Sequence, residues 1–151
     1  MGIGLGFRGE FHDKIWAIRA TYSFWSHGDF TFGYAYQNEK SGDKARMHGQ
    51  TLMFGCRQFI WRRLNAEIEF MPAYNPATSL IDGKTYTGFD MWGEARIGYR
   101  FDVIERKSFD FFVMPQMCGG MGIFRTNPWP GLSENAHDPF FFPLVMLGVR
   151  V

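Results

Sequence analysis

The side chains best suited to acid–base chemistry in this chain are its histidines. His12 and His137 are each followed by an aspartate, and His48 stands apart from both. A histidine and an aspartate that meet a serine, such as Ser41 or Ser133, form the catalytic triad of many hydrolases. No G-x-S-x-G elbow surrounds a serine here, so the spacing specifies no triad. If the protein is an enzyme, its catalytic candidates are His12, His48, His137, Asp138 and Ser133.

A second pair of reactive groups is formed by two carboxylates two positions apart, Glu67 and Glu69. On a strand such residues share a face, and paired carboxylates can perform acid–base catalysis. Arginines beside them would instead make the pair part of a structural ion network. We expect this structural role, with Arg57 and Arg96 as the neighbours of the two carboxylates.

Other motifs that could bind a cofactor have simpler explanations. Residues Gly4 to Gly9 match G-x-G-x-x-G, but a dinucleotide loop must join a strand to a helix, and this segment lies inside an alternating strand. Cys56 and Cys118 are predicted to be free thiols, because they lie on opposite faces of strands that are not neighbours. The dispersed histidines lack metal-ligand spacing, so we expect no metal and no other cofactor.

The elements that must position these residues are strands with one apolar face. In residues 89–101 the apolar and small residues occupy every second position, and Asp90, Glu94, Arg96 and Arg100 occupy the positions between them. A strand separates two such sets, whereas a helix would mix them. Hydrophobic residues make up 46% of the chain and aromatic residues 19%. No apolar run approaches the roughly 18–20 residues of a transmembrane helix.

The same pattern predicts one domain, residues 1–151, with eight strands. They span residues 2–11, 14–25, 30–39, 47–60, 64–74, 85–101, 108–124 and 140–151. The third, fifth and seventh connections (Lys40 to Arg46, Asn75 to Lys84, and Arg125 to Pro139) are longer than the second, fourth and sixth. An even number of antiparallel strands with short turns at one end and long loops at the other is typical of bacterial outer-membrane barrels. The fold class is therefore all-β: a closed eight-stranded antiparallel transmembrane barrel, with both termini at the periplasmic end.

The alternation also predicts which side chains face lipid. On the fourth strand the assignment is ambiguous between Leu52, Phe54 and Cys56 on one side and Met53 and Arg57 on the other, and the last strand is apolar on both faces. The glycines of residues 119–122 predict a bulge or close packing against a large inward aromatic. The outward set elsewhere is Ile3, Leu5, Phe7, Phe11, Trp16, Ile18, Ala20, Tyr22, Phe24, Phe30, Phe32, Tyr34, Tyr36, Leu64, Ala66, Ile68, Phe70, Pro72, Tyr74, Phe109, Phe111, Val113, Val145, Leu147 and Val149.

The inward face collects charges of both signs. All of its cations are arginines, whereas the lysines fall in turns or at strand ends, as expected if a guanidinium binds several carboxylates in a confined space. An eight-stranded barrel is just wide enough for side chains to fill, so we expect a plugged interior and no pore. The predicted interior ion network consists of Arg8, Arg19, Arg57, Glu67, Glu69, Asp90, Glu94, Arg96 and Arg100, with Glu10, Asp110 and Arg150 on the same inward face.

In these features the chain resembles the small outer-membrane barrels of the OmpA/OmpX type. The most typical string is Ala95 to Asp102, a strand that ends in aromatic residues before a periplasmic turn. The carboxyl terminus, Val149-Arg150-Val151, departs from the aromatic ending usual in that family. The resemblance implies a bacterial outer-membrane location and contact with lipopolysaccharide, with the long loops as the surface for another envelope protein. Members of the family include tethers, adhesins and lipid-modifying enzymes, so membership alone does not select a function.

The sequence favours a non-enzymatic barrel with a structural or loop-mediated binding role. Trp129, held between two prolines in the longest loop, is predicted to be a membrane-interface anchor or a binding tip. The first alternative is an enzyme that modifies lipid A or phospholipid in the outer leaflet, as a deacylase or an acyltransferase. The second is a soluble lipocalin-like carrier, which would need an apolar interior. A net charge of +1 gives no general attraction to nucleic acid.

Overall fold

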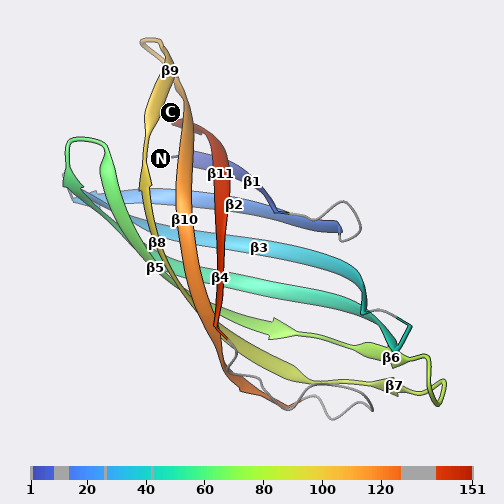
Figure 1. Ribbon diagram of the computed structural model, residues 1–151. Helices are drawn as coiled ribbons and strands as arrows, with labels where there is room; N and C mark the ends of the chain where they lie inside the picture. Colours follow the sequence, from blue (N-terminus) through green and yellow to red (C-terminus); the bar gives the residue numbers. More distant parts are fainter. Residues whose placement is uncertain (1, 9–13, 26, 42, 127–138, 151) are drawn as a thin grey trace.

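The computed structural model describes residues 2–8, 14–25, 27–41, 43–126 and 139–150, and within them the chain is all-β (Figure 1). No helix there is long and apolar enough to cross a membrane. The strands are β1 (Gly2–Arg8), β2 (Lys14–Trp25), β3 (Gly28–Ser41), β4 (Ala45–Trp61), β5 (Leu64–Tyr74), β6 (Ala77–Ser79), β7 (Thr85–Tyr86), β8 (Phe89–Tyr99), β9 (Phe101–Glu105), β10 (Asp110–Arg125) and β11 (Phe140–Arg150).

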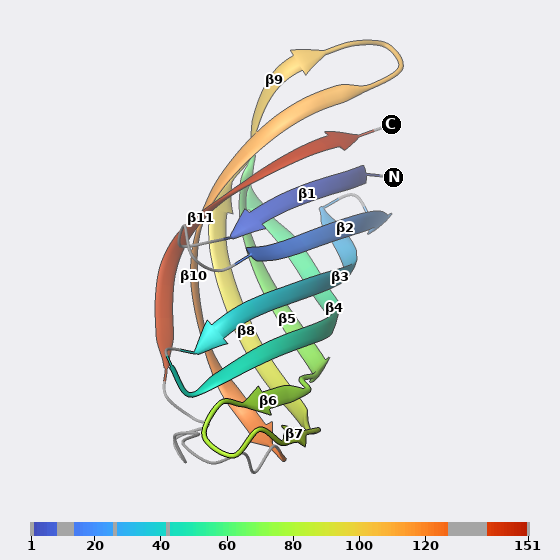
Figure 2. The same ribbon diagram turned by 90° about the vertical axis from the view of Figure 1, so that its right-hand side faces the viewer.

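The strands form one curled, barrel-like antiparallel sheet. Its order is β3-β2-β1-β11-β10-β8-β5-β4-β6-β7, and β3 also pairs with β4. The first and last strands are neighbours, with Ile3 opposite Val149, so the two ends of the chain lie side by side (Figure 2). The β3–β4 ladder is the longest, from Gly28 opposite Gln58 to Ser41 opposite Ala45.

The eight predicted strands correspond to the eight long strands, but three predicted connections are wrong. Lys40 to Arg46 is not a loop, because Lys40 pairs with Arg46 and the β3–β4 ladder continues to Ser41. The segment from 75 to 84 contains β6, which pairs with β4 beyond the end of β5, and β7 then pairs with β6. The predicted strand 85–101 is divided into β7, β8 and the start of β9, and the predicted turn 102–107 is mostly strand, because β9 pairs with β10.

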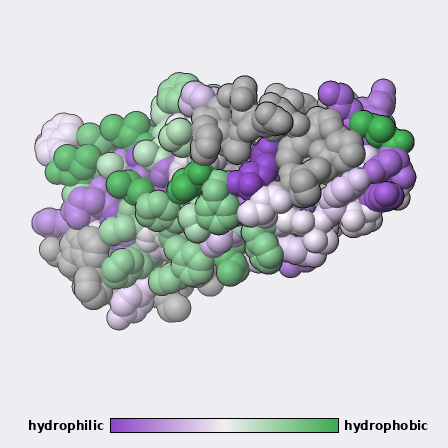
Figure 3. All heavy atoms as spheres, turned by 90° about the horizontal axis from the view of Figure 1, so that it is seen from below, coloured by the Kyte–Doolittle hydropathy of each residue, from purple (hydrophilic) through white to green (hydrophobic). Residues whose placement is uncertain are grey.

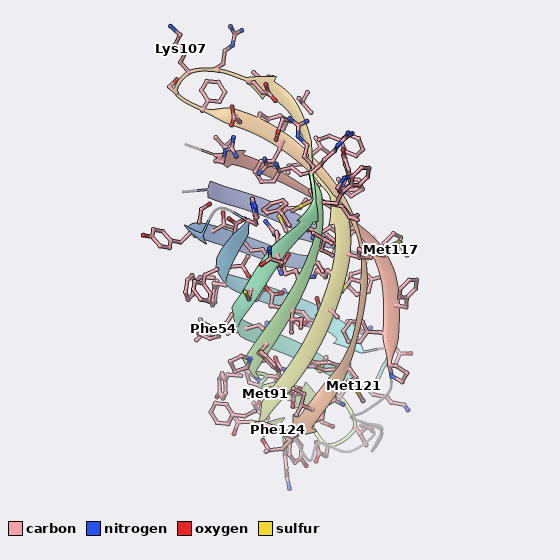
Figure 4. The ribbon with its side chains drawn as sticks, turned by 90° about the vertical axis from the view of Figure 1, so that its left-hand side faces the viewer. Phe54, Met91, Lys107, Met117, Met121 and Phe124 are labelled. Carbon is pink, nitrogen blue, oxygen red and sulfur yellow. The ribbon has the colours of Figure 1, made fainter. Side chains whose placement is uncertain are left out.

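The predicted alternation of inward and outward side chains is confirmed along the described strands, except for Arg150 at the end of the sheet. Along β8, Phe89, Ala95 and Ile97 are exposed, whereas Asp90, Glu94 and Arg96 are buried. The ambiguity on β4 is resolved, since Phe54 is 44% exposed and Met53 only 4%. Phe54 and Met117 accordingly lie on opposite flanks of the molecule, each directed away from the sheet (Figure 4). Cys56 is exposed, Cys118 is buried, and both are free thiols as predicted.

The outward surface changes character along the strands. On β5 every outward residue from Leu64 to Tyr74 is apolar or aromatic. On β3 and β4 the outward residues become polar beyond Tyr36, with Asn38, Lys40, Arg46 and His48 all exposed. Hydrophobic residues cover much of the left and middle of Figure 3, and hydrophilic residues gather at the right-hand end, where β3–β4 and β6–β7 terminate.

The glycine run in β10 has both of the features predicted for it. The ladder between β8 and β10 shifts register between Gly122 and Phe124. A Cβ atom on Gly120 would lie 2.5 Å from Cζ of Phe140 and 2.6 Å from the carbonyl oxygen of Gly93, whereas on the neighbouring Gly119 the nearest atom would be 3.5 Å away. Gly120, the inward glycine, therefore allows the ring of Phe140 and the backbone of Gly93 to approach the strand closely.

Replacement of Gly120 by alanine should lower the free energy of unfolding by about 1–3 kcal/mol, the usual cost of overpacking. The matched control is Gly119→Ala one residue earlier on the same strand, where a methyl group finds room. It should change stability by less than about 0.5 kcal/mol. Urea unfolding of both variants under the same conditions tests this, and equal losses would show that the inward contact is not the cause.

Candidate functional site

The most distinctive site is an ion network inside the curled sheet, with three arginines and three glutamates. Arg57 on β4 lies opposite Glu67 on β5, and Glu67 lies opposite Arg96 on β8. Two residues further along β5, Glu69 lies opposite Glu94. Because successive residues alternate in facing, every one of these side chains points inward. All of them, together with Arg19 on β2, are at least nine-tenths buried.

Short contacts join these groups into one cluster. Nη2 of Arg57 lies 2.9 Å from Oε2 of Glu67, and Nη2 of Arg96 lies 2.6 Å from Oε2 of Glu69. Arg96 also pairs with Glu94, donating from Nε at 3.1 Å. Two like charges directly opposite each other destabilise a sheet, and Arg96 between Glu69 and Glu94 offsets that repulsion. The predicted neighbours of the glutamate pair, Arg57 and Arg96, are thus confirmed.

Arg19 extends the network across the interior. It belongs to β2, which is separated from β5 by β3 and β4 in the sheet. Its Nη1 donates to Oε1 of Glu67 at 3.1 Å, and its Nη2 pairs with Glu69. The sequence predicts that Arg19 faces inward, but strand spacing gives no indication of which carboxylates it reaches. This contact links opposite walls of the curled sheet.

Neutral and sulfur-containing side chains fill the space around the ions. Cys118 on β10 donates its S–H to Glu94 at 3.1 Å, and Gln116 donates to Glu67 at 3.4 Å. Arg57 approaches the sulfur of Met146 at 3.8 Å. With Glu67 and Glu69 at most 1% exposed, a substrate has no approach to either carboxylate. The arrangement supports a structural network over a catalytic pair.

A further cluster of charges lies at the end near the termini. Arg63 pairs with Asp102 at 2.8 Å and Glu105 at 2.9 Å, and Arg100 pairs with Asp102 at 3.0 Å. The guanidinium of Arg100 also lies 5.2 Å from the ring centroid of Phe59, within cation–π range. The inward assignment of Arg150 is wrong in one respect: its side chain is 46% exposed, because it pairs with Asp110 at the end of the sheet.

At the opposite end, Asp90 accepts a hydrogen bond from Asn75 at 2.8 Å and pairs with Arg125 at 3.4 Å. Arg125 also lies over the ring of Trp92, 5.4 Å from its centroid. On the nearby β6–β7 hairpin, a hydrogen bond from Tyr86 lowers the pKa of Asp82, and the same bond raises the pKa of Tyr86. These contacts hold the acidic groups of this end to partners within the fold.

The structure assembles no catalytic site around the one candidate histidine that it describes. His48 is exposed on β4, and its Nδ1 lies 3.3 Å from the hydroxyl of Tyr36. Within the described ranges, no group of three His, Cys, Asp or Glu residues could hold a metal ion. The remaining predicted site residues lie outside the described residues or have side chains that are not described: Arg8, Glu10, His12, Ser41, Trp129, Ser133, His137 and Asp138.

Comparisons with protein-family models, curated proteins and solved structures find no match for this chain. The features of the fold that bear on function are an apolar outward surface, a buried ion network, and polar hairpins at one end.

Replacement of Arg96 by methionine should lower the free energy of unfolding by about 3–5 kcal/mol, because the buried carboxylates of Glu69 and Glu94 each lose an ion pair. The matched control is Arg150→Met, which removes a partly exposed ion pair at the sheet end and should cost no more than about 1 kcal/mol. Urea unfolding in one detergent compares the two variants.

A second substitution separates lost charge balance from lost packing. Glu94→Gln in the Arg96→Met background removes the carboxylate whose ion pair with Arg96 is lost, and it should recover part of the stability. If the double variant is as unstable as Arg96→Met alone, the loss comes from packing and not from the ion network.

Proposed function

We propose that the chain is a closed eight-stranded β-barrel that spans a bacterial outer membrane, with both termini periplasmic and no open pore. Each of the eight long strands pairs with two others, and the pairings β1–β11 and β3–β4 complete the cycle. A barrel of this kind leaves no unpaired backbone edge within a membrane, where an unpaired polar group is costly. The cyclic pairing supports closure.

The observation that carries this proposal is the inversion of polarity between the two faces of the sheet. Ile18, Phe70 and Leu147 are among many large apolar side chains that are about half exposed, while Arg19, Glu67 and Glu69 are buried. Turning the sheet so that its charged face met lipid would cost about 2–4 kcal/mol for each arginine near the middle of the bilayer. In water, the outward face would form a contiguous apolar surface far larger than a soluble monomer carries.

The length of the apolar surface also matches a membrane. The outward residues of β5 run from Leu64 to Tyr74 over 11 residues. At about 3.4 Å per residue and a strand tilt of about 35–45°, they cover roughly 24–28 Å along the membrane normal. The apolar band of such barrels is about 25 Å tall. Tyr36, Tyr74 and Phe89 would then form part of the aromatic girdle on the loop side.

The filled interior favours a structural or binding role over transport. The ion network occupies the centre of the sheet, and Met114, Met146 and Phe112 pack in the same interior nearer to the termini. The lipocalin-like alternative requires an apolar interior that can accept a ligand, and the buried arginines and glutamates argue against it. Among the described residues the enzyme alternative has no supporting contact, since His48 bonds to Tyr36 and not to a carboxylate.

The barrel should fold only in detergent or lipid. We expect the chain, refolded from urea, to enter phosphatidylcholine vesicles, to show a heat-sensitive shift in gel mobility, and to give no single-channel conductance in a planar bilayer. A monodisperse monomer in buffer without detergent would contradict the membrane assignment, and steady conductance would contradict the plugged interior.

The non-enzymatic role predicts that histidine variants leave the outer leaflet unchanged. His48→Ala should alter stability by less than about 0.5 kcal/mol, and the acylation of lipid A should not depend on the protein. The measurement is mass spectrometry of lipid A from cells that express the intact chain or the His12, His48 or His137 alanine variant. An acyl change that requires the intact chain and disappears in one variant would favour the enzyme, because loss of an acid–base group costs about 100-fold or more.

A further inference from the structure

The outward face of the polar hairpins carries a row of hydrogen-bond donors that the proposed function does not use. Lys40 on β3 lies opposite Arg46 on β4, and Arg46 lies opposite Thr78 on β6. Thr78 in turn lies opposite Thr85 on β7, with their hydroxyl oxygens 3.2 Å apart. Two cations and two hydroxyls thus stand in line across four strands.

Burial shows that this row points away from the interior. Ala45, beside Arg46, is fully buried and packs with Ala77, beside Thr78. Arg46 and Lys40 are exposed on the opposite face. One step closer to the apolar band, Asn38 lies opposite His48, and both are also exposed. We name these six residues the donor patch: Asn38, Lys40, Arg46, His48, Thr78 and Thr85.

Within the part of the chain that the structure describes, the charge of the patch is largely uncompensated. Arg46 forms no ion pair with any described side chain. Lys40 pairs with Asp43 at 3.2 Å, but Asp43 is fully exposed, so that pair contributes little. The carboxylate of the β6–β7 hairpin, Asp82, already accepts hydrogen bonds from Tyr86 and from the backbone N–H of Lys84. The surface therefore favours an anion with several acceptor oxygens.

The position of the patch identifies the source of that anion. In the proposed membrane orientation the apolar band ends at the level of Tyr36, which lies opposite Gln50. Each outward step along a tilted strand rises about 5 Å, so His48 lies about 5 Å and Arg46 about 10 Å above that level. The headgroup region of a bilayer is about 5–8 Å thick on each side, so the patch extends from this region to its outer edge. Arginine binds phosphate with a planar fork, and lysine and hydroxyl groups add single donors.

We propose that the donor patch binds the phosphate groups of an outer-leaflet lipid headgroup. The inference rests on the proposed membrane-spanning function. It adds the class of ligand, lipid phosphate, and the residues that bind it. Lipid phosphates would anchor the β3–β4 and β6–β7 hairpins at the membrane surface and give the barrel a preferred lipid neighbour.

The experiment measures the affinity of the detergent-refolded protein for lipid A with two phosphates and for the same lipid without them. We expect the phosphorylated form to bind at least 10-fold more tightly. The variant Lys40→Gln/Arg46→Gln should lose about 25-fold in affinity for it, since one cation near an anionic lipid is worth about fivefold. Asp43→Asn, which removes a competing carboxylate, should instead strengthen binding.

The matched control carries the same change of charge at the other end of the molecule. Arg106 and Lys107 are exposed in the β9–β10 turn, far from Met91 and Phe124 at the loop end (Figure 4). The variant Arg106→Gln/Lys107→Gln should bind phosphorylated lipid A within twofold of the intact protein. An equal loss in the two double variants would overturn the assignment of the site, because the effect would then be one of net charge.

Further outcomes separate lipid phosphate from free phosphate as the ligand, and separate this inference from the proposed membrane-spanning function. If inorganic phosphate at millimolar concentration displaces the lipid, the patch is a site for free phosphate and the lipid assignment is wrong. A protein that inserts into phosphatidylcholine vesicles but shows no preference for phosphorylated lipid A overturns this inference alone. A protein that stays in water as a monomer overturns the proposed function and this inference together.

Discussion

The rest of the structure depends on the neutralisation of six buried charges inside one curled sheet. Arg19, Arg57 and Arg96 meet Glu67, Glu69 and Glu94 without access to water. Transfer of an isolated ion into such a site costs many kcal/mol, and the cost is offset only when geometry supplies a partner for each charge. That requirement fixes the register of β4, β5 and β8, because a slip by one residue would turn the charges outward.

Neutralisation inside also determines what the outside can be. The interior is filled by the ions, by methionines and by Phe112, and the alternation of the strands places Phe32, Phe54 and Phe70 on the other face, where they are exposed. In water this arrangement loses the hydrophobic contribution that normally stabilises a domain. In a bilayer the same exposed face contacts hydrocarbon, and the ordered backbone pairings satisfy the polar groups of the main chain. The charged interior and the apolar exterior thus both follow from the alternation of polar and apolar residues along the strands.

Much of this fold could be predicted from the sequence, because alternation is a local signal. Residues 89–101 separate into two faces without reference to the rest of the chain, and the paired glutamates indicate their arginine neighbours through cross-strand register. The features that sequence reasoning missed depend on distance in space. Arg19 reaches Glu67 and Glu69 across the interior, from a strand that is not paired with theirs.

The short strands and the exposure of residues at strand ends also could not be predicted from the local sequence pattern. β6 forms because the edge of β4 at Ala45 to Met47 continues past the end of β5, which a propensity argument cannot detect. On β4, Leu52 and Met53 are both apolar, so hydropathy did not resolve their facing, although the charge of Arg57 on the same side as Met53 indicated it. Arg150 alternates correctly with its neighbours, but its place at the end of the sheet leaves it exposed.

The inverted polarity of the sheet can be measured most directly through Cys56, a natural outward thiol at the level of the apolar band. A spin label on Cys56, in a Cys118→Ser background and in lipid vesicles, reports collisions with dissolved oxygen and with a water-soluble nickel complex. A label on Lys107→Cys, with both native cysteines replaced by serine, provides the aqueous reference. The inverted arrangement predicts that oxygen relaxes the label on Cys56 strongly and nickel weakly, with the reverse at position 107. Equal access of nickel to both labels would contradict it.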